Sequence, residues 1–306
     1  MERRPDSKRP PPIELRQLHA FRVVAQELHY GRAAERLGIA QPPLSQLIKR
    51  LERALGCKLF DRDTRRVELT PAGAALYGLA TSLLALLNAG IERVGEIASG
   101  RAGRLSIGFT PTTALRILPR VVRAFRGEYG GVEIILSELL PDAMRDGLLT
   151  EQIDIALMRE PTPVAGIDVI VIADEPFVAV LPIGHALADP ALPFRLEALA
   201  GDPFVLFPRD QTSQGLAQTF ALCAEAGFMP DVVQEVPGWQ TAISLVGSGL
   251  GVSILPESVI SLHLPGIAYR SIVSPIRSRI CLLHRTGDDR PMVRNFIEHG
   301  LSVMRR

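Results

Sequence analysis

The chain has little cysteine and few aromatic residues. Its 306 residues include three cysteines, Cys57, Cys223 and Cys281, which are too few and too far apart for a disulfide framework or a zinc site. They are expected to be small buried or half-buried side chains. Aromatic residues make up only 5% of the chain, but hydrophobic residues make up 47%, which is enough for the cores of two or three domains.

The sequence also lacks the motifs of common enzyme classes. It has no HExxH, GxSxG or P-loop motif, and the segment GSGLG at residues 247–251 follows an expected helix, so it is a helix stop. The chain is therefore not expected to be an enzyme, and no cofactor or metal ion is expected. A solute-binding protein is the alternative for the C-terminal two-thirds, but that class does not explain the N-terminal part and would need an export signal.

Such a signal is not expected at this N-terminus. The segment MERRPDSKRPPP carries charges but has no apolar run behind it, which is unlike a signal peptide. Residues 1–12 are expected to form a disordered basic arm, and the protein is expected in the cytoplasm.

The net charge of +1 conceals an uneven distribution of basic and acidic residues. Residues 1–70 hold 15 Lys and Arg against 9 Asp and Glu, a net charge of +6, whereas residues 101–306 hold 18 against 22, a net charge of −4. A basic N-terminal part suits a polyanion, because each neutralised phosphate releases counterions. The mildly acidic C-terminal part is not expected to be a second nucleic-acid surface.

Residues 31–52, GRAAERLGIAQPPLSQLIKRLE, predict two short helices joined by a tight turn. Apolar residues recur on one face of the first helix, and Gly38 ends it. Pro42 and Pro43 begin the second helix, because a residue in a first helical turn needs no N–H partner. The second helix has a buried stripe at i, i+3, i+4 and i+7, formed by Leu44, Leu47, Ile48 and Leu51.

The outer face of the second helix is polar and cationic, as reading of the major groove requires. The alternative is an ordinary helical hairpin with a solvated basic face. The candidate DNA contacts on the helix pair are Arg32, Gln41, Pro42, Pro43, Ser45, Gln46, Lys49, Arg50 and Arg53.

Residues 57–70 have the alternating side-chain pattern of two strands around a turn at Asp63 and Thr64. This pattern predicts a hairpin wing that touches the DNA backbone. The candidate contacts of this wing are Arg62, Arg65 and Arg66. The alternative is a surface loop with solvated arginines.

Residues 72–91 form a run of 20 residues without a charge, about the length of a membrane span. The larger apolar residues, however, recur with a period near 3.5, which favours a seam between two helices. A long helix from about Pro71 to Ser99 is therefore predicted, with a seam formed by Leu76, Leu83, Leu87, Ile91 and Val94.

Beyond a hinge at Gly100 and Gly103, short apolar segments alternate with helical stretches. This pattern predicts an α/β fold with mostly parallel strands, organised as two small subdomains. One helix is predicted over residues 112–125, with an interruption at Pro119.

Ligands of open α/β sheets bind at the carboxyl ends of strands, where helix N-termini offer free N–H groups. Three loops in such positions carry hydroxyl, amide or cationic side chains, which suit an organic anion. The alternatives are simple helix capping by the threonines and a core position for Trp239, the single tryptophan. The candidate ligand contacts are Thr110, Thr112, Thr113, Arg159, Arg209, Trp239, Gln240 and Thr241.

An ordered set of motifs carries a family resemblance. Between Glu14 and Gly73 the motifs are L-x-x-L-x-x-F, AAERLGIAQPPLS, LE-x-x-LG-x-x-LF-x-R and LTPAG, and weaker ones follow, among them IDIALMRE, VLPIGHALA and LVGSGLGVSILPESV. With these motifs the chain resembles LysR-type transcriptional regulators over nearly its whole length. The segments AQPPLS and IGFTPT are most like the branch that senses aromatic acids or their ring-cleavage products.

The resemblance implies an N-terminal winged helix-turn-helix domain (residues 13–70), a linker helix that dimerises the protein (71–100) and a periplasmic-binding-protein-like effector domain (104–306). In that family the chain crosses twice between two α/β subdomains, here about 104–173 with 270–306, and about 174–269. The effector lies in the cleft between the subdomains.

The implied function is sequence-specific regulation of transcription, controlled by a small organic acid. The implied partners are double-stranded DNA, the effector and further copies of the chain in a dimer of dimers, with RNA polymerase as another candidate. Three positions depart from the family pattern: Ala40 as a helix cap, Leu47 on the second helix and Pro141, which replaces a threonine that often contacts the effector.

Overall fold

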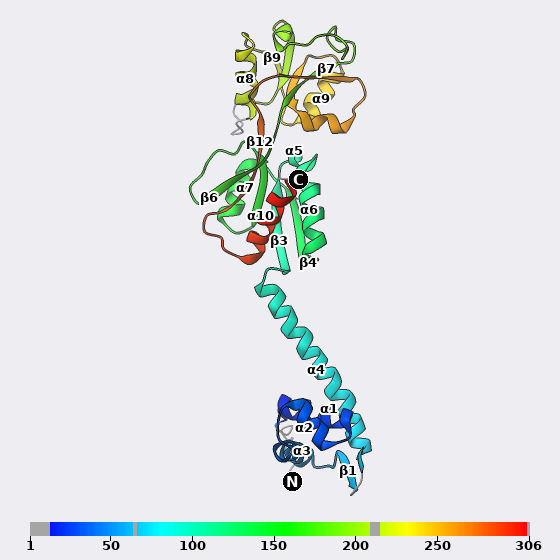
Figure 1. Ribbon diagram of the computed structural model, residues 1–306. Coiled ribbons are helices and arrows are strands. Elements are labelled where there is room, and N and C mark those ends of the chain that lie inside the picture. The colour runs from blue at the N-terminus through cyan, green and yellow to red at the C-terminus, as the bar shows by residue number, and fades with distance from the viewer. Residues whose placement is uncertain (1–12, 64–65, 209–214, 305–306) are drawn as a thin grey trace, which may run out of the picture. The chain divides into compact units, whose positions relative to one another are not determined.

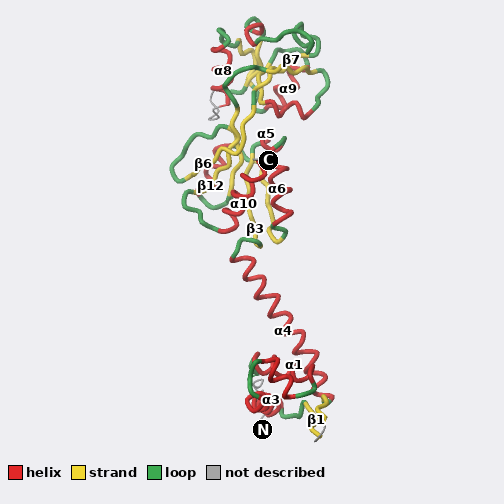
Figure 2. Tube along the Cα trace, in the orientation of Figure 1, coloured by secondary structure: helices red, strands yellow, loops and turns green. Residues whose placement is uncertain are grey.

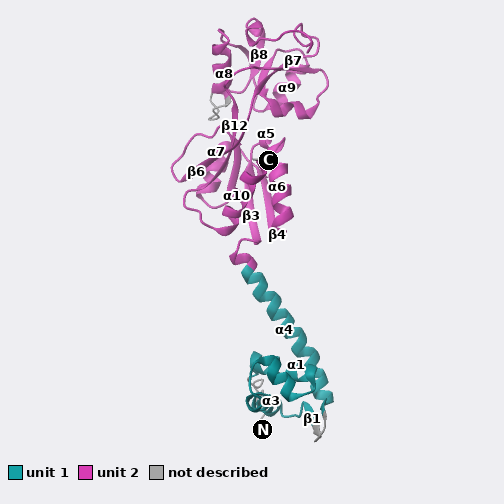
Figure 3. Cartoon of the chain, viewed as in Figure 1, with its two compact units in different colours: residues 1–95 teal, residues 96–306 magenta. Residues whose placement is uncertain are grey.

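The computed structural model describes residues 13–63, 66–208 and 215–304 (Figure 1). Of Arg62, Asp63 and Arg66 only the backbone is described, and the expected basic arm at residues 1–12 lies outside the described residues. The chain divides into two compact units, residues 1–95 and residues 96–306 (Figure 3). The first unit is helical apart from one hairpin, whereas the second alternates strands and helices (Figure 2).

The first unit is built from three short helices, a hairpin and most of a long helix. Gly38 ends the second helix with φ of 66°, a left-handed conformation that glycine adopts without a steric cost. Prolines occupy the first turn of the third helix, as the sequence predicts. The elements are α1 (Leu15–Glu27), α2 (Tyr30–Leu37), α3 (Gln41–Leu55), β1 (Phe60–Asp63), β2 (Arg66–Leu69) and α4 (Pro71–Ala98).

The core of the first unit lies between α1, α2, α3 and the start of the hairpin. Leu44, Ile48 and Leu51 of α3 are fully buried, while Leu47 is half-buried against the same core. Phe21 and Phe60 meet there with ring centroids 5.3 Å apart. Burial of such side chains contributes about 1.5–3 kcal/mol each, so packing determines which face of α3 turns inward.

The buried residues of helix α4, Gly73, Ala80 and Leu84, all lie in its first half. Leu76 is half-buried against the core of the first unit, so it is not part of an exposed seam as the sequence predicted. The reason is that the hairpin and α1 cover the first turns of the helix. Further along, α4 exposes Leu79, Leu83, Leu86, Leu87, Ile91, Val94 and Ile97. Among the described residues it is the one helix long and apolar enough to cross a membrane, by length and composition only.

The second unit begins with a five-stranded sheet of order β4-β3-β5-β12-β6. Helices α6 and α10 pack on one face around Phe125 and Phe296, and α7 packs on the other face around Met144 (Figure 1). The elements of this first subdomain are β3 (Ala102–Phe109), α5 (Pro111–Ala114), α6 (Ile117–Glu128), β4 (Gly131–Glu138), α7 (Pro141–Leu149), β5 (Ile155–Arg159), β6 (Ile167–Glu175), β12 (Ser278–Arg285) and α10 (Pro291–Met304).

The second subdomain contains a three-stranded sheet, β10-β7-β11, and a parallel pair, β8-β9. The two faces of β7 belong to different clusters, because alternate residues point to opposite sides of a strand. The elements are β7 (Phe177–Pro182), η1 (Leu196–Leu199), β8 (Pro203–Leu206), α8 (Gly215–Glu225), β9 (Asp231–Glu235), α9 (Trp239–Gly247), β10 (Ser253–Pro256), η2 (Glu257–Leu262) and β11 (Ile267–Ser271).

The prediction of mostly parallel strands is wrong. In the second unit β3 pairs in parallel with β4 and β5, and β8 with β9, but β12 pairs antiparallel with β5 and β6. Strand β7 likewise pairs antiparallel with β10 and β11. The chain leaves the first subdomain after β6 and returns in β12, and these two strands run beside each other in opposite directions.

The predicted helix over residues 112–125 is also wrong in detail. Two helices, α5 and α6, replace it, and they meet at Leu115 and Arg116 instead of at Pro119. Pro119 lies in the first turn of α6, where the absence of its N–H leaves no acceptor unpaired.

The three cysteines differ in exposure. The expectation that all three are buried or half-buried is wrong for Cys57. Cys223 and Cys281 are buried, and burial raises the pKa of each thiol to about 11. Cys57 is exposed after the end of α3.

We predict that iodoacetamide at neutral pH modifies Cys57 alone in the folded protein, because the thiolate is the reactive species and access is required. Intact-mass measurement should show one adduct before denaturation and three after it. Rapid modification of Cys223 or Cys281 in the folded protein would contradict the packing around β12 and α8.

Candidate functional site

The outer face of α3 carries exposed polar and cationic side chains. Ser45 is half-buried at the edge of the core. Arg53 donates from Nε to the carbonyl of Lys49 at 3.4 Å, and Ala40 provides no side-chain cap. The fully exposed members of the predicted contact set on this helix are Gln41, Pro42, Pro43, Gln46, Lys49, Arg50 and Arg53.

Arg32 of α2 is exposed, but its side chain contacts Glu27 of the same unit. Its Nη2 donates to the carbonyl of Glu27 at 2.6 Å, and its Nε lies 3.4 Å from the Glu27 carboxylate. These contacts tie α2 to the end of α1. The predicted wing contacts, Arg65 and the side chains of Arg62 and Arg66, lie outside the part of the chain that the structure describes.

A buried carboxylate joins α3 to the hairpin. Glu52 is 5% exposed, and its Oε1 accepts the backbone N–H groups of Leu59 at 3.0 Å and Phe60 at 3.5 Å. Lys58 Nζ lies 3.8 Å from Oε2. The start of β1 is therefore fixed to the helix whose outer face is polar. Sequence reasoning missed this residue, although a charge beside Leu51 on the buried stripe was a usable signal.

The hydroxyls of the Thr110–Thr113 loop have different surroundings. Thr113 is fully buried inside α5 and donates to the carbonyls of Thr110 at 2.7 Å and Leu157 at 3.4 Å, so its hydroxyl is used within the fold and its prediction as a ligand contact is corrected. Thr110 and Thr112 are half-buried with their Oγ1 atoms 3.4 Å apart. Thr110 and Thr112 thus contact each other through their hydroxyls, whereas the hydroxyl of Thr113 bonds to the backbone.

Trp239, at the start of α9, is buried at 7% exposure within the cluster around α9. Its indole Nε1 has no hydrogen-bond partner among the described residues. Leu115, from the first subdomain, packs against the same cluster, so the Thr110 loop and the start of α9 lie on neighbouring surfaces. Gln240 and Thr241 are exposed, and Arg209 lies outside the described residues.

Arg159 ends β5 and is 10% exposed. Its Nη2 lies 2.5 Å from Oε1 of Glu175, and its two terminal nitrogens donate to Ser278 and Ser258. Burial lowers the pKa of the Arg159 guanidinium, and Glu175 opposes that shift. Both terminal nitrogens are thus occupied by protein groups, which the predicted role as a ligand contact did not anticipate.

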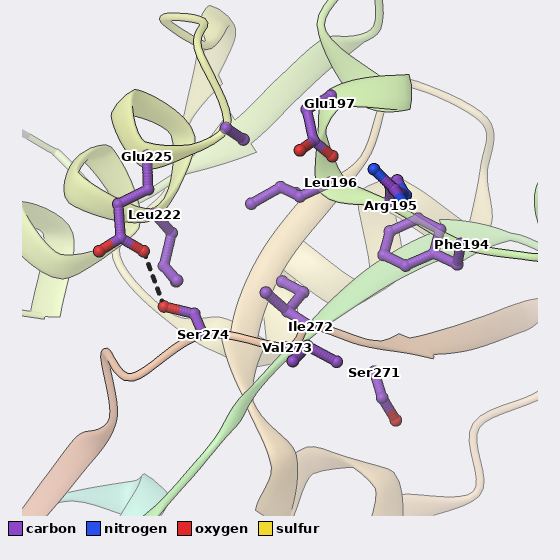
Figure 4. Close-up of a pocket in the computed structure, with 11 residues that line it drawn as sticks. Phe194, Arg195, Leu196, Glu197, Leu222, Glu225, Ser271, Ile272, Val273 and Ser274 are labelled. Carbon is purple, nitrogen blue, oxygen red and sulfur yellow. Dashed lines mark hydrogen bonds between the residues drawn. The ribbon is translucent and has the colours of Figure 1, made fainter.

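A cavity of about 270 Å³ lies in the second subdomain, away from the predicted loops (Figure 4). Its walls come from η1, the end of α8 and the segment after β11, and Glu225 accepts a hydrogen bond from Ser274 Oγ at 2.9 Å. Glu197 and Glu225 face this space from opposite sides (Figure 4). No sequence motif pointed to it.

Comparison with known proteins fits these two units. Residues 15–74 match the bacterial regulatory helix-turn-helix protein of the lysR family, and residues 98–305 match the LysR substrate binding domain. The chain belongs to the LysR family of transcriptional regulators. Its fold, with an N-terminal helix-turn-helix and an α/β effector-binding domain, is the fold of that family.

Two curated LysR relatives match over almost their whole length. The HTH-type transcriptional regulator AlsR of Bacillus subtilis is 32% identical over 93% of this chain and 94% of its own. CatR of Pseudomonas putida is 38% identical over 92% of this chain and 96% of its own. The crystal structure of CbnR, a LysR family transcriptional regulator, superposes with a TM-score of 0.87 at 30% identity, covering 94% of this chain and 99% of that one.

We predict that Glu52→Ala in this LysR-family chain loosens the hairpin, because two buried N–H groups lose their acceptor at about 1–3 kcal/mol each. Hydrogen exchange should show faster exchange of the Leu59 and Phe60 amides. Glu35→Ala, a change at an exposed position of α2, is the control and should leave those amides protected. Equal protection in Glu52→Ala and wild type would remove Glu52 from this role.

Proposed function

We propose that this regulator reads promoter DNA with the outer face of α3 and that a small organic anion controls the DNA-bound state. The observation that carries the DNA part is the exposed row of Gln46, Lys49 and Arg50 on a helix whose opposite face is fully buried. Amides and cations on such a helix match the base edges and phosphates of a major groove. A related structure, full-length CbnR complexed with its target DNA, has a TM-score of 0.80 at 29% identity.

Mutation of a residue that contacts a base and mutation of one that contacts a phosphate should affect DNA binding differently. Gln46→Ala is expected to cost about 1–3 kcal/mol and relax base preference, because an amide contact to a base edge discriminates between bases. Lys49→Ala is expected to weaken all sequences alike and reduce the salt dependence of binding. Fluorescence anisotropy on matched and mutated duplexes at several salt concentrations measures both. If Gln46→Ala leaves affinity and base preference unchanged, Gln46 is not a reading residue.

Helix α4 is proposed to pair with α4 of a second copy. Leu83, Leu87, Ile91 and Val94 share one face and are between 38% and 68% exposed, while Glu92 lies on the opposite face. An exposed apolar stripe at this spacing is typical of a seam between helices. The dimers are proposed to associate further into a tetramer through their second units.

Leu83→Asp should make the protein monomeric, because a carboxylate in the seam would lose its water without a partner, at a cost of several kcal/mol. Ala85→Asp, on the opposite face of α4, is the matched control and should leave the oligomer intact. Sedimentation velocity distinguishes the species. An unchanged oligomer in Leu83→Asp would place the seam elsewhere.

The effector is proposed to bind between the Thr110–Thr112 loop and the start of α9. The hydroxyl of Thr112, which lies 3.4 Å from that of Thr110, and the indole N–H of Trp239 are both donors, and a carboxylate is an acceptor for each. A buried donor without a partner costs free energy that a ligand acceptor would recover. Arg209 and Gln240 remain proposed members of the same site. The motifs AQPPLS and IGFTPT favour aromatic acids or their ring-cleavage products.

Thr112→Ala should weaken effector binding by about 1–3 kcal/mol, the range for a hydrogen bond to a charged group. Isothermal titration against benzoates, muconates and related acids tests this in the full-length protein. Thr150→Ala, a surface change just after the end of α7, is the control and should bind as wild type does. If a ligand binds wild type and Thr112→Ala equally, the site is wrong.

A DNA-binding regulator must reach the chromosome, so we propose that the protein is located in the cytoplasm. RNA polymerase is a further candidate partner. We propose that it acts as a regulator and not as an enzyme, because the families and relatives that it matches are transcriptional regulators.

A further inference from the structure

The end of β5 carries two adjacent buried charges, and each holds one of the two strands by which the chain crosses between the subdomains. Arg159 Nη2 lies 2.5 Å from Oε1 of Glu175, the last residue of β6. Glu160 Oε2 lies 2.9 Å from Nη2 of Arg279, near the start of β12. Both crossings are therefore fastened to the first subdomain at one point.

The backbone at this point is also held firmly. Glu160 has φ of 43°, a left-handed conformation that is uncommon for a non-glycine residue. Its carboxylate accepts the N–H of Arg279, and its own N–H donates to the carbonyl of Arg279 at 3.2 Å. Such a conformation persists only where several contacts fix it, so the end of β5 is a rigid support.

From this support Arg159 reaches into the second subdomain. Its Nη1 donates to Ser278 Oγ of β12 at 3.0 Å, but its Nη2 donates to Ser258 Oγ of η2 at 3.1 Å. Ser258 is 6% exposed, and its carbonyl accepts a hydrogen bond from Ser261 at 2.7 Å. Ser258 belongs to η2 and therefore moves with the second subdomain.

We propose that the Arg159–Ser258 hydrogen bond is a latch that sets the resting angle between the two subdomains. The guanidinium is a rigid planar fork. Glu175 and Ser278 hold that fork on the first subdomain, so it cannot follow Ser258 when the second subdomain turns about the crossings. Arg159 is then a positioning residue and not a ligand contact.

Because the latch sets an angle between the two subdomains, a ligand can change that angle. A ligand that binds better at one angle than at the other shifts the population toward that angle. This consequence rests on the proposed function, whereas the latch itself exists without any ligand. The competing account is that Arg159 and Glu175 are a buried ion pair of the core, in which case the Ser258 hydroxyl is dispensable.

Double electron–electron resonance on the full-length, ligand-free protein measures the angle. Spin labels at Asp142→Cys in α7 and Ser248→Cys after α9 report on the two subdomains, since both positions are exposed. The background is Cys57→Ser, because Cys223 and Cys281 are buried. Dilution with unlabelled protein leaves one labelled protomer in each oligomer.

Wild type should give one dominant distance. Ser258→Ala should raise the ratio of a second distance to the first by roughly 10- to 100-fold, the factor for losing a hydrogen bond to a charged group. Ser258→Ala leaves Arg159 paired with Glu175 and Ser278, so the fold should persist. Ser258→Thr keeps the hydroxyl and should behave as wild type does.

Two further variants make the test specific. Ser261→Ala removes a hydroxyl from the same η2 segment without touching Arg159, and it should leave the distances unchanged. Arg159→Lys keeps the charge beside Glu175 but lacks the fork, so it should shift the distances as Ser258→Ala does, and the double variant should shift them no further.

Unchanged distances in Ser258→Ala, or equal shifts in Ser258→Ala and Ser261→Ala, would overturn the latch. Additive shifts in the double variant would also overturn it. A failure to find any effector by titration would count against the proposed function alone, because these distances are measured without a ligand.

Discussion

The pairing of two buried charges at the end of β5 determines how the second unit is connected. A charge removed from water is tolerated only when it is paired and hydrogen-bonded. Arg159 therefore pairs with Glu175 of β6, the next strand, and Glu160 pairs with Arg279 of β12. Because those strands carry the two crossings, the need to pair two adjacent charges brings both crossings to one place.

The first unit uses the same physical means for a different purpose. Glu52 is buried on α3 and accepts backbone N–H groups from the start of the hairpin. The helix proposed to read bases and the hairpin proposed to touch the backbone are thus joined by one carboxylate. In both units a buried ionised side chain positions a functional segment, while the proposed binding groups, such as Gln46 and Thr112, make few bonds within the protein.

Local features of the fold could be predicted from the sequence because their causes are local. The period of Leu44, Ile48 and Leu51 defined the inner face of α3, and Gly38 and Pro42 defined the ends of α2 and α3. The direction of β12 could not be predicted, because it depends on where the chain returns after an excursion of about a hundred residues.

The candidate sites divide in the same way. The exposure of Gln46 and Lys49 follows from helical geometry, so it could be predicted from the sequence. The hydroxyl of Thr113 donates to a carbonyl in β5, 44 residues away, and the bonds of Arg159 reach residues 99 and 119 positions away. No local pattern contains such partners. The prediction that Cys57 is buried or half-buried was wrong because a residue just after a helix end can face either way.

The central claim is that this chain recognises specific DNA sequences as a symmetric assembly. Selection from a pool of randomised duplexes with the full-length protein tests that claim most directly. The account predicts enrichment of one sequence with two related half-sites in inverted orientation, because a two-fold dimer presents two copies of α3. Recovered duplexes that bind tightly but share no sequence would contradict it, since they would show that only the phosphate backbone is bound.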